Sequence, residues 1–98
     1  MRLIEIKKIV EASEKISGLV KSTECQKSNY FSNLFDSNIF YKREDKQTVK
    51  SFKIRGAHNK ILSLDISDIK NGLVCASAGN HAQGFALSCS TLKYNGTV

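Results

Sequence analysis

The stretch Leu73-Val74-Cys75-Ala76-Ser77-Ala78-Gly79-Asn80-His81 decides the fold that this sequence predicts. Its first four residues form a continuous apolar run of strand length, which is typical of a strand buried on both faces of a sheet. The next four, Ser77-Ala78-Gly79-Asn80, indicate a turn that leads into a helix. The sequence therefore predicts a strand, a turn and a helix in immediate succession.

The segment after this turn carries an apolar stripe at helical spacing, formed by Ala82, Phe85, Ala86, Cys89 and Leu92. A turn at Asn95-Gly96 then leads into Thr97-Val98, where a second strand begins. A parallel crossover requires the returning strand to pair with the first one. We therefore expect the chain to end inside a βαβ unit.

The N-terminal half predicts further elements. Residues 3–21 form an amphipathic pattern typical of a helix. Residues 22–37 indicate a loop with one short helix around an aromatic patch, Tyr30, Phe31 and Phe35, which we expect to lie in the core. Residues 38–42 alternate as a strand does, and residues 43–50 form a polar connection.

The middle of the chain predicts a helix over about residues 52–64, with Ser51 as its N-cap and an apolar face that includes Ile54 and Ile61. The polar link over residues 65–71 has room for one helical turn, which Gly72 would close. The whole pattern predicts an α/β fold.

Length and composition limit the class of protein. The 98 residues suffice for one small domain, and no apolar run approaches the roughly 18 residues that a membrane helix needs. Charged residues mixed into the first ten positions argue against a secretory signal. Three widely spaced cysteines suggest neither a disulfide framework nor a zinc site, and they fit reduced thiols in the cytoplasm.

The chain is basic, with 15 Lys and Arg against 9 Asp and Glu, a formal net charge of +6. No segment interleaves Arg with aromatic residues as nucleic-acid grooves do. The charge excess therefore indicates a solvated basic surface. A small basic nucleic-acid binder stays an alternative, which a salt-dependent binding titration would detect.

Lys53 is the first residue that could carry chemistry. It stands in the expected first helical turn, where unpaired N–H groups and the positive end of the helix dipole disfavour a further positive charge. Lys50 and Arg55 are close in sequence. These effects raise the neutral, nucleophilic fraction of an amine, which imine chemistry with a carbonyl requires. The alternative is an ordinary surface lysine on a basic helix.

The segment Ser77-Ala78-Gly79-Asn80-His81 is the second candidate. Free amides at a helix start favour a carboxylate or phosphate, and ligands of open α/β sheets gather at the carboxyl ends of strands. The alternative is an ordinary turn with Asn80 as the helix cap. No partner stands at metal-ligand spacing from His58 or His81, so we expect no metal site, and no motif supports a Cys–His nucleophile pair.

Three stretches, Lys42-Arg43-Glu44-Asp45, Ser51-Phe52-Lys53-Ile54-Arg55-Gly56-Ala57 and Ser77-Ala78-Gly79-Asn80-His81-Ala82-Gln83-Gly84, resemble in order and spacing the threonine dehydratases (threonine ammonia-lyases) of fold type II, which use pyridoxal phosphate. Ser28-Asn29-Tyr30-Phe31-Ser32 and Leu87-Ser88-Cys89 are most similar to the short catabolic, biodegradative branch. The resemblance covers nearly the whole chain.

This resemblance implies a fold like that of the tryptophan synthase β subunit, with an incomplete, mainly parallel sheet and helices packed on it. It identifies residues 1–98 as a single truncated N-terminal portion of a catalytic domain, from a cytoplasmic enzyme whose full-length relatives are homo-oligomers. The phosphate cup of the family would lie beyond Val98. We therefore expect little or no dehydratase activity from this chain alone.

The resemblance also assigns roles to residues. Lys53 would bind the pyridoxal phosphate covalently beside Phe52, and Asn80 would donate a hydrogen bond to the cofactor's phenolic oxygen. The substrate carboxylate, from L-threonine or L-serine, would lie in a cradle formed by Ser77, Ala78, Gly79, Asn80 and His81. Positions that match an AMP effector site of the catabolic branch are Thr48, Val49 and Gln83.

The reaction that the resemblance implies is β-elimination of threonine to 2-oxobutanoate and ammonia, with Lys53 as the base at Cα. Serine racemases resemble the same stretch but carry a serine where this chain has Ala78, and that serine acts as a second base. Alanine cannot accept a proton, so elimination is favoured over racemisation. The alternatives are a serine dehydratase or racemase-like enzyme, and a degenerate remnant without catalytic function, whose unpaired strand would make it prone to aggregate.

Overall fold

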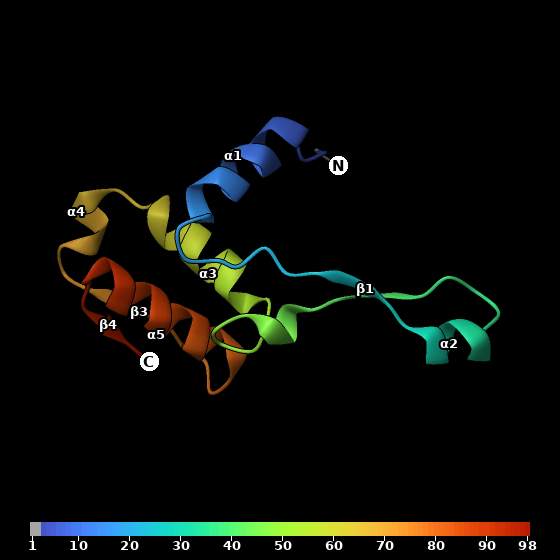
Figure 1. The fold of residues 1–98 in the computed structure, drawn as a ribbon. Helices are drawn as coiled ribbons and strands as arrows, with labels where there is room; N and C mark the ends of the chain where they lie inside the picture. Colours follow the sequence, from blue (N-terminus) through green and yellow to red (C-terminus); the bar gives the residue numbers. More distant parts are fainter. Residues whose placement is uncertain (1–2) are drawn as a thin grey trace.

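The computed structural model describes residues 3–98. The elements in chain order are α1 (Ile6–Ile16), β1 (Cys25–Lys27), α2 (Asn29–Leu34), β2 (Phe40–Lys42), the 3₁₀ helix η1 (Glu44–Lys46), α3 (Lys53–Leu62), α4 (Ile66–Ile69), β3 (Leu73–Val74), α5 (Asn80–Leu92) and β4 (Gly96–Thr97). Figure 1 shows a body built around α3 and α5, from which the β1–α2–β2 segment projects as an arm. This arm gives the molecule principal extents of 53 × 30 × 27 Å.

The predicted βαβ unit is confirmed. Strands β3 and β4 pair in parallel, with Leu73 opposite Gly96 and Val74 opposite Thr97, and α5 forms the crossover. Val74 is nevertheless 83% exposed, so the prediction of a strand buried on both faces is wrong for this chain. Only the face toward α5 is covered, because no other described element packs against the opposite face.

Helix α3 lies between α1 and α5 and forms two apolar clusters. The first joins α3 and α5 to β3 through Ile61, Cys75, Phe85 and Cys89. The second joins α1 to α3 and contains Ile16, Val20 and Ile54, with Leu19, Val49 and Leu87 packed against it. The expected stripe on α5 is confirmed at Phe85 and Cys89, whereas Ala86 faces solvent.

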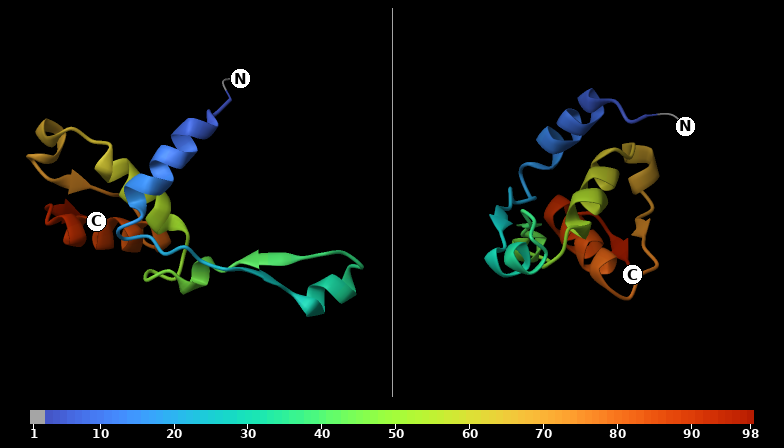
Figure 2. Two further views of the ribbon diagram at one scale, coloured as in Figure 1. Left: turned by 45° about the horizontal axis from the view of Figure 1, so that its top comes forward. Right: turned by 90° about the vertical axis from the view of Figure 1, so that its right-hand side faces the viewer.

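The arm adds a pairing that the sequence did not predict. Strands β1 and β2 form an antiparallel ribbon, and α2 lies at its far end in both views of Figure 2. The Ser28 hydroxyl caps α2 by accepting a hydrogen bond from the Phe31 N–H at 3.3 Å. The prediction of a core aromatic patch is wrong, because Tyr30 and Phe35 are 72% and 61% exposed. These rings pack against their neighbours on the arm and not in the body.

Several predicted boundaries shift. Helix α1 ends at Ile16, short of residue 21, because the chain turns there: the N–H groups of Leu19 and Val20 both donate to the Ile16 carbonyl. Ser51 is not the cap of α3; the N-cap is Phe52, and the buried Ser51 hydroxyl has no hydrogen-bond partner in residues 3–98. The turn at Gly72 is confirmed, with a φ of 89° that suits glycine.

None of the helices between residues 3 and 98 is long and apolar enough to cross a membrane.

Candidate active site

Lys53 is the first residue of α3, and its exposed side chain borders a cavity of about 300 Å³. Its Nζ lies 5.3 Å from the centroid of the Phe52 ring. The cavity is also bordered by His81, which comes from the first turn of α5. The fold therefore brings together two stretches that are separated by more than twenty residues in the sequence.

Close packing of α3 against α5 produces this meeting. Gly84 on α5 is buried, and a Cβ atom placed there would lie 3.1 Å from the backbone nitrogen of Ile54 and 3.2 Å from the carbonyl carbon of Lys53. His81 precedes Gly84 by three residues, so it lies one helical turn away, toward the start of α5. The missing side chain at Gly84 thus places the start of α3 beside the start of α5.

The turn before α5 holds the other predicted residues. Gly79 is the N-cap, its N–H donates to the Ser77 hydroxyl at 3.3 Å, and its carbonyl accepts the bond from the Gln83 N–H at 3.2 Å. Asn80 is the first helical residue and not the cap. Ala78, Gly79 and Asn80 are exposed and Ser77 is half-buried. The first N–H groups of a helix have no intrahelical acceptor, so this exposed turn can accept an anion.

A second cavity of about 360 Å³ follows β3 and shares Gly56, Ala57 and His81 with the first. It is bordered as well by Ala76, at the start of the turn, and by Phe85. His81 thus stands between two hollows at the carboxyl end of β3, which is where ligands bind in open α/β sheets.

Arg55 is held by Glu44, a pairing that the sequence did not predict. Both Glu44 oxygens accept from Arg55, at 2.7 Å from Nη2 and 2.9 Å from Nε. The hydrogen bond from Arg55 lowers the pKa of Glu44 to about 2. The eleven residues between them cross η1 and the start of α3, so no sequence periodicity indicates this contact. The pair fixes the first turn of α3, where Lys53 stands.

Gln47 supports the same region from the core side. Its side chain is 1% exposed and bonds both backbone groups of Lys21: Oε1 accepts from the N–H at 3.0 Å, and Nε2 donates to the carbonyl at 2.8 Å. The segment after α1 is thereby tied to the connection that leads into α3.

The positions matched to an effector site do not border the Lys53 cavity. Thr48 and Gln83 are exposed, and Val49 is half-buried against the cluster of Ile16, Val20 and Ile54. Val49 and Gln83 both lie near this cluster, because Leu87, one turn after Gln83, also packs on it.

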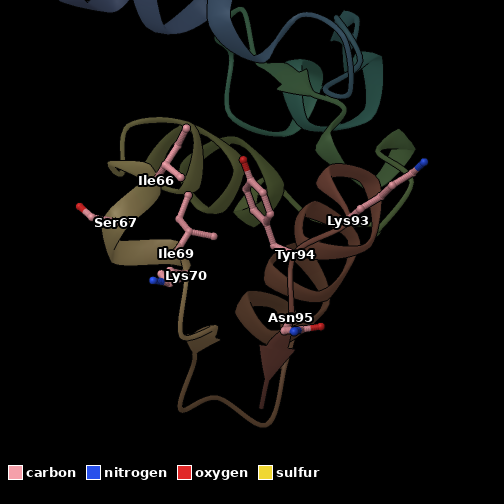
Figure 3. Close-up of a pocket in the computed structure, with 7 residues that line it drawn as sticks. All are labelled: Ile66, Ser67, Ile69, Lys70, Lys93, Tyr94 and Asn95. Carbon is pink, nitrogen blue, oxygen red and sulfur yellow. The ribbon is translucent and has the colours of Figure 1, made fainter.

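A further hollow of about 340 Å³ lies between α4 and the end of α5. Figure 3 shows the side chains of Ile66 and Ile69 next to the Tyr94 ring, while the Lys93 amine points away. None of the predicted site residues borders this hollow.

Comparison with known proteins identifies related sequences. The model of the family described as pyridoxal-phosphate dependent enzyme matches residues 16–98. The chain is 47% identical over 95 residues to the biosynthetic L-threonine dehydratase IlvA of Staphylococcus saprophyticus, and 45% identical over 95 residues to the catabolic L-threonine dehydratase TdcB of Escherichia coli K12. Each match covers 97% of this chain, but only 22% and 29% of the two relatives. The chain therefore spans less than a third of their length.

Solved structures share the same arrangement. Maize serine racemase superposes with a TM-score of 0.88 at 33% identity, covering 97% of this chain and 30% of that one. The serine racemase of Dictyostelium discoideum superposes with a TM-score of 0.87 at 30% identity. It covers 95% of this chain and 30% of that one. A bacterial threonine deaminase superposes with a TM-score of 0.86 at 32% identity, covering 97% of this chain and 34% of that one. The incomplete sheet and its helices thus match part of a larger fold.

Proposed function

We propose that this chain, which belongs to the family of pyridoxal-phosphate dependent enzymes, is the N-terminal part of a threonine dehydratase that converts L-threonine to 2-oxobutanoate and ammonia. The observation that carries the proposal is the shared cavity of Lys53 and His81, which puts a lysine amine next to an anion-accepting turn. The threonine dehydratases among its relatives support the same reaction.

The residues present fit pyridoxal phosphate. A covalently held aldehyde cofactor needs a primary amine that is open to a cavity, and the Lys53 side chain is exposed there. Lys53 forms no ion pair within residues 3–98, so no carboxylate competes for its amine. When bound, the cofactor supplies an electrophilic aldehyde and a ring that delocalises the charge left at Cα of the substrate.

Lys53 would hold the cofactor and would then act as the base that removes the Cα proton of the substrate. The Ser77–His81 turn would fix the substrate carboxylate through N–H groups and the Ser77 hydroxyl, which orients the Cα–H bond toward the amine. Asn80, exposed at the start of α5, would donate to the phenolic oxygen of the cofactor.

Ala78 favours elimination over racemisation. Racemisation requires a second group that delivers a proton to the opposite face of Cα, and a methyl side chain carries none. The similarity to maize serine racemase is therefore a similarity of fold around a turn that, in this chain, lacks that group at Ala78.

The catabolic branch rests on Ser28-Asn29-Tyr30-Phe31-Ser32 and Leu87-Ser88-Cys89, and relatives of both branches share 45% or more of the aligned residues. If the catabolic assignment is right, AMP binds at Thr48, Val49 and Gln83, and Gln83→Ala weakens that binding. AMP that binds wild type and Gln83→Ala equally would contradict this part of the proposal. We further propose a cytoplasmic, homo-oligomeric enzyme, which the free thiols of Cys25, Cys75 and Cys89 support.

The proposal is tested by labelling. The chain is incubated with pyridoxal phosphate, reduced with borohydride and digested, and the modified lysine is identified by mass spectrometry. We expect Lys53 to carry the label, Lys53→Ala to lose it, and the matched variant Lys50→Ala to keep it. Labelling spread evenly over exposed lysines would remove the proposed role.

Turnover is a separate measurement. We expect little or no 2-oxobutanoate from threonine with the 98 residues alone, because positioning of a cofactor needs contacts on several sides. Robust turnover by this chain would contradict that expectation without affecting the assignment of Lys53.

A further inference from the structure

A basic cavity lies on another side of α3 from Lys53. It has a volume of about 380 Å³ and is bordered by three cationic and three hydroxyl side chains, those of Lys21, Lys42, Arg55, Ser13, Ser17 and Ser22. They come from α1, the segment after it, the end of β2 and α3, and Figure 1 shows that segment running past α3. Of these residues only Arg55 also borders the Lys53 cavity.

The cavity holds more hydrogen-bond donors than the protein uses. The Lys42 amine donates to the Thr23 carbonyl, which leaves two of its three hydrogens. Arg55 donates through Nε and Nη2, and Nη1 forms no bond within residues 3–98. The Lys21 amine has no protein acceptor among the same residues.

The nearby acids do not neutralise these lysines. None of the residues that border the cavity is acidic. Glu44 is the acid closest in the network, and both its oxygens are occupied by Arg55, with further bonds from Thr23 and Gln47. Glu24 pairs with Lys46 and Asp45 pairs with Arg43. Two positive charges, those of Lys21 and Lys42, therefore remain uncompensated beside three hydroxyl groups.

We propose that this cavity binds a small organic phosphate monoester. The Lys21 and Lys42 amines and the Ser22 hydroxyl would hold the phosphate oxygens, because ammonium and hydroxyl donors match a phosphate dianion. Ile16 and Val20 border the same cavity and would cover an apolar part of the ligand. The volume lies within the range of small-molecule sites. This inference does not depend on the reaction at Lys53.

The test is an NMR titration of the 15N-labelled chain at fixed ionic strength, with inorganic phosphate and with phenyl phosphate as probes. We expect saturable shifts at Ser13, Lys21 and Ser22, and tighter binding of phenyl phosphate because Ile16 and Val20 cover its ring. Lys21→Gln should weaken phosphate binding about fivefold, as the loss of an exposed charge pair does. Lys21→Arg should restore it.

The matched control is Lys8→Gln, which removes the same charge from the exposed surface of α1 outside the cavity. We expect it to change the affinity less than about twofold, since screened charges at a distance act weakly. Equal weakening by both Gln variants, or shifts that never saturate, would overturn the proposal. Shifts centred on Gly79 and His81 would also overturn it, because they would place the anion at the Lys53 site.

Discussion

Gly84 on α5 and Ile54 on α3 are in backbone contact: a Cβ atom at Gly84 would lie 3.1 Å from the Ile54 nitrogen and 3.2 Å from its Cα. Such a distance is shorter than ordinary van der Waals contact, and the atoms it meets belong to the backbone, which cannot rotate away. The contact sets the spacing of the two helices whose first turns carry Lys53 and His81.

Gly84→Ala should therefore separate the helices. We expect it to lower the free energy of unfolding by about 1–3 kcal/mol, the usual cost of overpacking, and to reduce labelling of Lys53 by pyridoxal phosphate. Gly56→Ala is the matched control, because no atom lies within 4 Å of its Cβ position. On propensity alone this control should gain about 0.5–1 kcal/mol. Both energies are measured by urea unfolding, and equal effects of the two variants would contradict the packing argument.

Gly96→Ala should loosen the pairing of β4 with β3. The added methyl would lie 2.8 Å from Cys89 Sγ and 3.0 Å from Phe85 Cε1, inside the apolar cluster. We expect a loss of about 1–3 kcal/mol. Cys89→Ala should make room for the methyl, so the double variant should lose less than the sum of the single variants. Additive losses would show that the clash is relieved in some other way.

Glu44 should make stability depend on acid pH. Its pKa in the folded chain is about 2, against an ordinary value of 4.5, chiefly because Arg55 donates to it. A depressed pKa contributes stability above the ordinary value, and this contribution is lost as the pH falls from about 4.5 toward about 2. It amounts to at most about 3 kcal/mol. Glu44→Gln should be less stable at pH 7 and should lack this loss, as unfolding curves between pH 7 and pH 2.5 would show.

His58 should act at a higher pH. It is 4% exposed, its Nδ1 has no hydrogen-bond partner within residues 3–98, and burial lowers the pKa of its imidazole below 6.5. The unfolded chain then binds a proton before the folded chain does, so stability falls as the pH drops below about 6.5. His58→Phe should remove this dependence between pH 8 and pH 5.5. A variant with the wild-type slope in urea unfolding would exclude His58 as its source.

Much of the candidate site could be predicted from short patterns. Lys53 was expected in the first turn of a helix and is the first residue of α3, and the Ser77–Asn80 turn does follow an apolar strand. These features depend on local capping, periodicity and glycine, which act within a few residues. The ribbon of β1 and β2 was missed because its three-residue strands are too short to show alternation.

The sequence by itself determined the βαβ unit, the helices and the two stretches that resemble a pyridoxal-phosphate enzyme, because each is encoded by neighbours along the chain. Only the tertiary structure decided that Lys53 and His81 share a cavity, that Glu44 holds Arg55 and that Val74 faces outward. Those outcomes depend on contacts between distant segments. Such contacts are selected by shape and charge in three dimensions, and they leave no period in the order of residues.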